Sequence, residues 1–344
     1  MAPFEAKVLD AHDPSWEAFL LSHRDALPYH HPAWVETLSD VYGYEPRAAV
    51  VRSADDELIG GLPFVEVGGR VRARRWVSLP FTDVCPPLVA GGLEERQLST
   101  AVEQLRREHG IGALEVRAPL AGFGERTALR GVRHQLELGD PDALFAAFRS
   151  QVRRNIRTAE KAGLEVRRAE GRDDLTRTYF DLHAETRRRL GVPPQPRRFF
   201  ESLWRHVLEP GLGFLLLAYH GETAVAGAVF LEWNGRIVYK YGASDREHWP
   251  LRPNNLLFWE CIRRCAAAGA RSLDFGRSDL EDEGLRAFKQ SWGAPEEPLA
   301  YTALGRGPSR AGSGSGAQLL RPLFRASPNW VGRMVGATLY RWAA

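Results

Sequence analysis

The sequence predicts an α+β protein of two similar tandem units, each a mixed, mostly antiparallel sheet flanked by helices. The first observation is an internal repeat, because residues 50–71 and 216–237 align without a gap. They share Gly61/Gly227, Phe64/Phe230, Glu66/Glu232, Gly69/Gly235 and Arg70/Arg236. Each copy reads as two apolar runs around a polar turn, then a Gly-Arg turn into a third strand, which is typical of a β-meander.

The second observation is the length, since 344 residues suit about two domains. The repeat spacing is also far longer than the ~20–50 residues of a solenoid unit. It therefore indicates duplication of a domain-sized unit, with chance similarity of two hairpins as the alternative. The third observation is that helical and strand patterns alternate in both halves of the chain.

In the first unit, helical patterns cover 15–26 and 31–43, and strand patterns cover 46–51, 58–67 and 70–80. A helix over 93–110 and a strand over 113–119 follow. We place this domain at 1–142. Near its end, Asp140 is expected to cap a helix that has Pro141 at its first position. The spacing predicts that this helix continues through 148–163 and ends at Gly163.

The second domain, 143–304, continues with a strand at 164–170 and helices over 173–191 and 197–208. The second meander occupies 213–243. A helix over 253–270, a strand at 272–276, a short helix at 283–293 and a strand at 299–304 complete it. Residues 305–316, rich in glycine and serine, form a flexible linker by composition.

The C-terminal segment 317–344 is basic and amphipathic, with four arginines and no acidic side chain: Arg321, Arg325, Arg333 and Arg341. One interpretation is a terminal helix pair that folds back onto the first unit. The other is an anchor for anionic lipid, which gives peripheral contact at the inner face of a membrane.

Composition and cysteine usage indicate an ordinary globular, cytoplasmic protein. The chain is 44% hydrophobic and 26% charged, with a formal net charge of +3. No apolar run approaches the ~20 residues that span a bilayer, and no secretory signal is visible at the N-terminus. Three cysteines favour a reducing compartment. Cys261 and Cys265 share one helix face, where buried packing explains them better than a metal site, so no metal is expected.

The densest polar segment is 274–293, where Asp274 ends an apolar strand, Arg277 follows a glycine, and Lys289 lies between Phe288 and Trp292. A lysine fixed by aromatic neighbours can stabilise negative charge developing on a carbonyl or phosphate. The alternative is a surface lysine whose stem lies over an aromatic pair.

A second segment, 239–260, brings Tyr241 and Ser244 to a loop that enters a helix at Asn254 and Asn255. Backbone N–H groups at such a helix start can bind an anion. The loop lacks glycine between Ala243 and the helix, which disfavours close approach of a phosphate, and capping alone is a second explanation for Asn254.

Basic helices form a third candidate site. Arg153 and Arg154 on one helix and Arg189 on a later one could bind phosphate, or could simply face solvent. Asp83, in the turn-rich stretch 79–87, is either a turn former or a carboxylate of the active site.

Together these segments resemble the FemABX-like branch of the GNAT superfamily, the peptidoglycan-bridge aminoacyltransferases and their exopolysaccharide-associated relatives. The motifs are RRNIRTAEKAG, RRLGVPPQP, YKYGASD, PNNLLFWECI and DFGRSDLEDEGLRAFKQSWGA, and the match covers most of 30–304. The resemblance implies two tandem GNAT-like domains, the first completed by the C-terminal segment.

The resemblance also implies chemistry: an acceptor amine attacks the ester carbonyl of an aminoacyl-tRNA, and a Phe-Lys pair matching Phe288-Lys289 handles the developing negative charge. Asp83 or Asp274 could accept the proton from the amine. Bridge-forming members carry a lysine on the helix after their first Trp-containing motif. The stretch HPAWVETLSD has none here, so the acceptor could be a different amine.

Three functions remain open. The first is aminoacyl transfer from aminoacyl-tRNA, with no permanently bound cofactor, to a cell-envelope precursor or small metabolite. Its partners would be tRNA and that amine. The second is N-acyl transfer from acyl-CoA or an acyl carrier in exopolysaccharide synthesis, although WPLRPNNLL stands where GNAT enzymes have a glycine-rich pyrophosphate turn. The third is a non-catalytic GNAT-like binding module. No Ser-His-Asp or Cys-His arrangement stands out, which favours direct attack without a covalent intermediate.

Overall fold

A computed structural model describes residues 4–69 and 72–305. Contacts divide this part of the chain into two compact units. The first contains the residues up to Gly131 and those from Pro298 to Gly305, and the second runs from Val132 to Glu297. The linker expected at 305–316 and the segment 317–344 lie, apart from Gly305, outside the described residues.

The elements of the first unit are β1 (Glu5–Asp10), α1 (Pro14–Ser22), η1 (Pro28–His30), α2 (Pro32–Tyr42), β2 (Glu45–Arg52), β3 (Leu58–Gly69), β4 (Arg72–Val77), β5 (Leu88–Val89), α3 (Glu95–Glu108), β6 (Ala113–Val116), η2 (Gly124–Arg126) and most of β13 (Glu296–Gly305). Its sheet has the order β1-β2-β3-β4-β6-β13, with β5 on β3. All neighbours are antiparallel except β4 and β6, which are parallel.

The elements of the second unit are the end of β7 (Thr127–Glu137), α4 (Pro141–Ala147), α5 (Ser150–Lys161), β8 (Leu164–Arg168), η3 (Asp174–Tyr179), α6 (Phe180–Leu190), α7 (Arg197–Leu203), η4 (Trp204–Leu208), β9 (Gly213–His220), β10 (Thr223–Trp233), β11 (Arg236–Ser244), η5 (Trp249–Leu251), α8 (Pro253–Ala267), β12 (Ser272–Ser278) and α9 (Glu283–Gln290). The order β8-β9-β10-β11-β12-β7 repeats that of the first unit, including one parallel pair, β11 and β12.

The internal repeat corresponds to equivalent hairpins, β2–β3 and β9–β10. A shared packing feature explains why both carry a glycine. A Cβ on Gly61 would lie 2.5 Å from the Trp16 ring, and a Cβ on Gly227 would lie 2.7 Å from the Tyr179 ring. In each unit, therefore, a strand glycine leaves room for an aromatic side chain, which comes from α1 in the first unit and from η3 in the second.

The last strand of each sheet comes from the other half of the sequence. β7 follows β6 along the chain, but its residues from Val132 onward pair with β12 of the second unit. β13 follows β12, but its residues from Thr302 onward pair with β6 of the first unit. The domain boundaries expected at 142 and 304 therefore differ from the divisions after Gly131 and Glu297 in the structure. The reason is that sequence order does not show which sheet a connecting strand joins.

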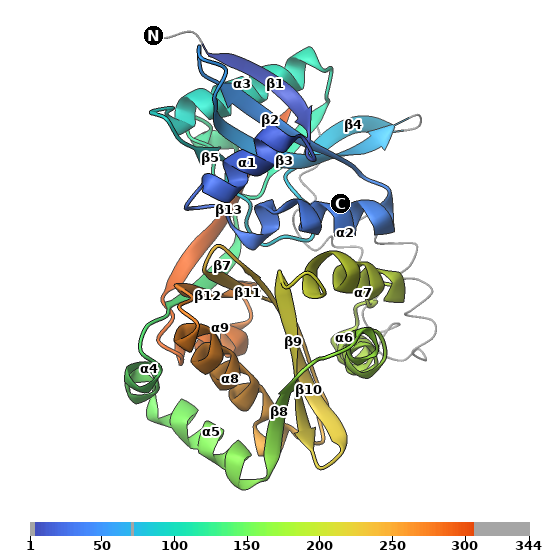
Figure 1. Cartoon of the computed structure of the whole chain (residues 1–344), viewed down its shortest axis with the longest axis vertical. Coiled ribbons are helices and arrows are strands. Elements are labelled where there is room, and N and C mark those ends of the chain that lie inside the picture. The colour runs from blue at the N-terminus through green and yellow to red at the C-terminus, as the bar shows by residue number, and fades with distance from the viewer. Residues whose placement is uncertain (1–3, 70–71, 306–344) are drawn as a thin grey trace. The chain divides into compact units, whose positions relative to one another are not determined.

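Helices cover both faces of the second sheet (Figure 1). α5 and α8 pack on one face and α6 on the other. The face under α8 carries a buried core that includes Leu216, Phe230, Phe258 and Phe275, together with Cys261 and Cys265. The expected packing role of the two cysteines is thereby confirmed, and burial raises the pKa of Cys261.

The prediction of one continuous helix from Asp140 to Gly163 is wrong, because the structure has two helices there, α4 and α5. Asp140 does cap α4, accepting the Ala143 N–H at 2.8 Å, with Pro141 at the first position. Phe148 then turns to an extended conformation (ψ 148°) and packs against Trp292, so α5 starts separately at Ser150. Burial of one aromatic ring overrides the helical pattern here. No described helix is long and apolar enough to cross a membrane.

Candidate active site

Lys289 lies on α9 and is buried, with 2% of its surface exposed. Its Nζ donates to the carbonyl oxygens of Gly276 at 2.7 Å and Arg277 at 3.0 Å, both on β12. The alternative of a lysine on the surface therefore does not describe this side chain. A buried ammonium needs such acceptors, because desolvation without them is costly. Lys289 thus fixes the end of β12 as well as placing a cation there.

β11 and β12 part beside this lysine. They pair in parallel only through Arg236/Ser272, Ile237/Leu273 and Val238/Asp274. Beyond that point β12 stays paired with β7, while β11 continues to Ser244 without pairing to β12. Where β11 is no longer paired with β12, Lys289 supplies the donors for the β12 carbonyls of Gly276 and Arg277.

Phe288 and Trp292 flank Lys289 in an aromatic cluster. Phe288 is half-buried and contacts Phe258, with ring centroids 5.7 Å apart. Trp292 is fully buried between Phe148, Phe258 and Phe275. Its Nε1 has no hydrogen-bond partner within the described parts of the chain. Phe288 is thus the more accessible of the two rings.

Asp274 and Arg277 shape the same strand end. Asp274 is buried, and its Oδ1 accepts the Gly276 N–H at 2.7 Å, which supports the positive φ of 72° at that glycine. Its Oδ2 lies 3.9 Å from Arg133. Arg277 donates to Asp279 at 2.6 Å. Asp83 belongs to the first unit, where its backbone carbonyl accepts from Tyr301 at 2.7 Å.

A β-bulge in β11 determines where Tyr241 points. Val229 pairs with Tyr241 and Phe230 with Tyr239, so Lys240 is the extra residue. Tyr239 packs on Phe258 of α8, with centroids 4.8 Å apart. Tyr241 instead contacts Phe199 on α7, at 5.8 Å. The bulge therefore sends Tyr241 to the face covered by α6 and α7.

Around Tyr241 lies a buried polar group that sequence reasoning missed. Gln195 Nε2 donates to Tyr241 Oη at 3.2 Å, and the ring of His183 lies 5.8 Å from that of Tyr241. Burial, with a smaller contribution from the charge of nearby Arg187, lowers the pKa of His183 to about 3. The available signal was the helical spacing that puts His183 on the same face as Phe180 and Ala184.

Ser244 ties Arg189 and Trp249 together at the end of β11. Its carbonyl accepts from Arg189 at 3.2 Å, and its Oγ accepts from Trp249 Nε1 at 2.8 Å. The Arg189 guanidinium lies over the Trp249 ring, 4.8 Å from the centroid. Of the predicted site residues, the structure thus brings Arg189 and Ser244 into direct contact, and Trp249 is a neighbour that the sequence did not single out.

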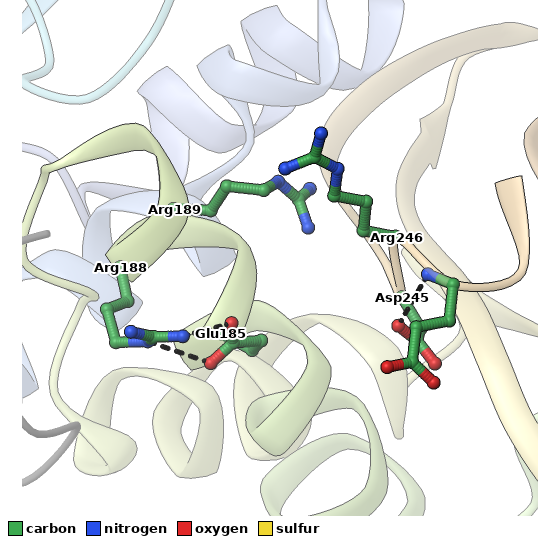
Figure 2. A pocket seen from close by; sticks show the side chains of 6 residues that line it. Glu185, Arg188, Arg189, Asp245 and Arg246 are labelled. Carbon is green, nitrogen blue, oxygen red and sulfur yellow. Dashed lines mark hydrogen bonds and ion pairs between the residues drawn. The ribbon is translucent and has the colours of Figure 1, made fainter.

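Arg189 also lines a pocket of about 590 Å³ (Figure 2). The lining residues come from the C-terminal part of α6 and the loop after β11: Glu185, Arg188, Arg189, Asp245, Arg246 and Glu247. Figure 2 shows Arg189 and Arg246 extending toward each other from these two segments. Arg246 lay within a motif of the sequence, but only the fold shows that it faces Arg189.

The start of α8 has few N–H groups to offer an anion. Pro253 has none, Asn255 N donates to Arg252 O at 3.1 Å, and Arg252 N donates to Trp249 O at 3.0 Å. The buried Asn255 side chain accepts from Asn155 of α5 at 3.4 Å. Neither Asn254 nor Asn255 is a side-chain cap. This helix start is therefore a poor phosphate cradle.

Arg153 and Arg154 do not join Arg189. They lie on α5, where they donate to Ala146 O at 3.1 Å and Gln151 Oε1 at 2.7 Å. α5 packs on α8, and α6 lies on the opposite face of the sheet (Figure 1). The predicted basic residues therefore form two separate groups, one on each face.

Comparison with known proteins identifies the fold. The acetyltransferase (GNAT) domain family matches residues 146–290. The crystal structure of FemX superposes with a TM-score of 0.68 at 16% identity, covering 86% of this chain and 96% of that one. A tandem GNAT protein from the clavulanic acid biosynthesis pathway gives 0.53 at 16% identity, covering 89% and 100%. The expected α+β class with GNAT-like units is confirmed.

A sequence relative supports the same branch. The Lipid II:glycine glycyltransferase of Staphylococcus haemolyticus (strain JCSC1435) is 33% identical over 85 residues. This match covers 23% of the present chain and 20% of that protein, so it spans about a fifth of the relative's length. Together with the GNAT match and the FemX structure, it confirms the resemblance to FemABX-like proteins.

Proposed function

We propose that this chain is an aminoacyltransferase that forms an amide between an aminoacyl group, carried on tRNA, and an amine of a cell-envelope precursor. The observation that carries the proposal is the position of Lys289 beside the parting of β11 and β12. A carbonyl held in that gap would develop negative charge near a fixed ammonium. Preorganised charge of this kind is a major source of rate enhancement.

Attack is direct. The acceptor nitrogen forms a bond to the ester carbonyl carbon, the tetrahedral oxyanion is stabilised by Lys289, and the ester C–O bond then breaks. The proton leaves the amine, and the ribose oxygen gains one. Asp83 or Asp274 as proton acceptor stays a prediction, as do Phe288 and Tyr241 as substrate contacts. Positioning of both substrates supplies the remaining rate.

The start of α8 favours tRNA over acyl-CoA as donor. A pyrophosphate bound there would need several backbone N–H groups, and Pro253, Arg252 and Asn255 leave few. The similarity to a protein named Lipid II:glycine glycyltransferase supports an envelope precursor as acceptor. Acyl-CoA or acyl-carrier-dependent transfer is the competing function. Membrane contact through 317–344 remains a prediction about residues outside those described.

A donor titration tests the proposal. Purified protein is titrated with charged tRNA, uncharged tRNA, acetyl-CoA and long-chain acyl-CoA over a salt series. We expect tighter binding of charged tRNA, with log affinity falling linearly with log salt because counterions are released. Binding of acyl-CoA without tRNA would overturn the proposal and assign the alternative donor.

A further inference from the structure

Two arginines from different segments face one pocket in the second unit. Arg189 comes from the last turn of α6, and Arg246 from the loop after β11. Figure 2 shows their guanidinium groups extending toward each other across the pocket. Two like charges in one pocket repel each other, so the arrangement is stabilised when an anion lies between them.

Glu185 and Asp245, which act on Arg189 only through their charge, make their hydrogen bonds with other groups. Glu185 accepts two hydrogen bonds from Arg188, at 3.0 and 2.7 Å. Asp245 accepts from His248 at 2.8 Å and from the Glu247 N–H at 3.0 Å. Within the described residues, no ion pair joins a carboxylate to Arg189 or Arg246. Burial lowers the pKa of Arg189, with a smaller lowering from the charge of Arg246, while the charges of Glu185 and Asp245 raise it.

Arg189 is held in place before any ligand binds. It stacks on Trp249 and donates to the Ser244 carbonyl. Ser244 is itself buried, and its N–H donates to Thr186 Oγ1 at 3.2 Å. A guanidinium that is already ordered loses little conformational entropy on binding. Arg246 is exposed and can move to complete the contact.

Trp249 adds an aromatic surface to the charged pair. Trp249 is 42% exposed, more than the other tryptophans that the structure describes. An indole beside two arginines offers both contacts that single-stranded RNA requires, a base on an aromatic ring and a phosphate on guanidinium groups. An anionic group of the acceptor would need the arginines but not the indole.

We propose that Arg189, Arg246 and Trp249 form a subsite for the single-stranded 3′ end of the RNA donor. A phosphate binds between the two guanidinium groups, and a base stacks on the exposed part of Trp249. This inference rests on the proposed function, since it concerns how the donor is held. It places binding of the donor's phosphate on the α6 side of the sheet rather than at Arg153 and Arg154 on α5.

Binding of defined RNAs by the full chain tests the subsite. The probes are an RNA hairpin with a short single-stranded 3′ overhang, the same hairpin with a blunt end, and one with abasic overhang positions. The variants are Arg246→Ala and Trp249→Ala. Arg177→Ala is the matched control, because it removes one positive charge from an exposed helical site that pairs only weakly with Asp173, at 3.6 Å.

We expect Arg246→Ala to weaken overhang binding about tenfold and to reduce the salt slope by about 0.7. Trp249→Ala should weaken binding of the overhang hairpin about tenfold. The wild type should bind the hairpin with the abasic overhang about tenfold more weakly than the one with the normal overhang. Arg177→Ala should bind like the wild type. Each variant is checked for folding by thermal denaturation.

The failure of this inference is distinguishable from that of the proposed function. If the wild type binds charged tRNA but both variants bind the overhang unchanged, the subsite is overturned and the function stands. If Arg246→Ala and Trp249→Ala weaken binding of the overhang hairpin and the blunt hairpin equally, the pocket does not bind the single-stranded end and the inference is again overturned. If the wild type binds acyl-CoA and no RNA, the proposed function falls, and the inference falls with it.

Discussion

Tyr239 and Tyr241, two residues apart on β11, pack on opposite faces of the sheet. Tyr239 contacts Phe258 of α8, and Tyr241 contacts Phe199 of α7. In a regular strand, residues i and i+2 share a face. The extra residue Lys240 breaks that alternation. Tyr239 therefore contributes its ring to the core under α8, and Tyr241 contributes its ring to the side covered by α6 and α7.

Gly242 makes room for the Tyr239 hydroxyl. A Cβ at this position would lie 1.8 Å from Tyr239 Oη, so we expect Gly242→Ala to lower the free energy of unfolding by about 1–3 kcal/mol. Tyr239→Phe should recover part of that loss in a double-mutant cycle measured by chemical denaturation. Gly284→Ala, on α9 with nothing nearer than 3.9 Å, is the control and should not destabilise. Equal stability of Gly242→Ala and wild type would contradict the bulge geometry.

Removal of the Lys289 ammonium should affect turnover more than substrate binding. We expect Lys289→Met to lower kcat about 100-fold or more, since a fixed donor to an oxyanion is lost. The carbonyls of Gly276 and Arg277 would also lose their donor, at about 1–3 kcal/mol of stability. Single-turnover kinetics, with thermal denaturation alongside, measure both effects. A folded variant with unchanged kcat and KM would remove Lys289 from the mechanism.

His183 should make the protein acid-sensitive. Its pKa is lowered from 6.5 to about 3, so the unfolded chain binds the proton more readily than the folded one. This contribution to stability is present above pH 6.5 and is lost as the pH falls, at roughly 1.4 kcal/mol per unit. In His183→Gln, the free energy of unfolding should fall less between about pH 7 and about pH 5 than in the wild type. Urea denaturation at both pH values measures this difference.

The control for that measurement is His220→Gln, an exposed imidazole at the end of β9. It should retain the acid sensitivity of the wild type. If the wild type is equally stable across the whole range, the assignment to a buried neutral His183 is wrong.

Ser278 carries a buried hydroxyl at the end of β12. Its Oγ has no hydrogen-bond partner among the residues that the structure describes, and only 1% of the side chain is exposed. We expect Ser278→Ala to leave stability unchanged or raise it by up to about 1 kcal/mol, because an unpaired buried polar group is costly. Thermal denaturation checks this. Destabilisation by more than that amount would show that the hydroxyl has a partner.

Sequence patterning predicted the tandem α+β organisation because a duplicated meander keeps its glycine and aromatic positions. Gly61 and Gly227 were visible as a repeat, and the structure supplies the reason, an aromatic ring over each. The Lys289 corner was also visible, since Phe288, Lys289 and Trp292 are close in sequence. Arg246, Trp249 and His183 were missed as site residues because their partners lie on separate elements.

The sequence by itself determined the α+β class, the two units and the segment that carries Lys289, because these depend on local periodicity and short-range neighbours. Only the tertiary structure decided that β7 and β13 join sheets distant in sequence order, that α5 and α6 lie on opposite faces, and that Arg189 faces Arg246. The physical reason is that strand pairing and burial of charge depend on contacts between distant segments, which hydrophobic patterning along the chain does not encode.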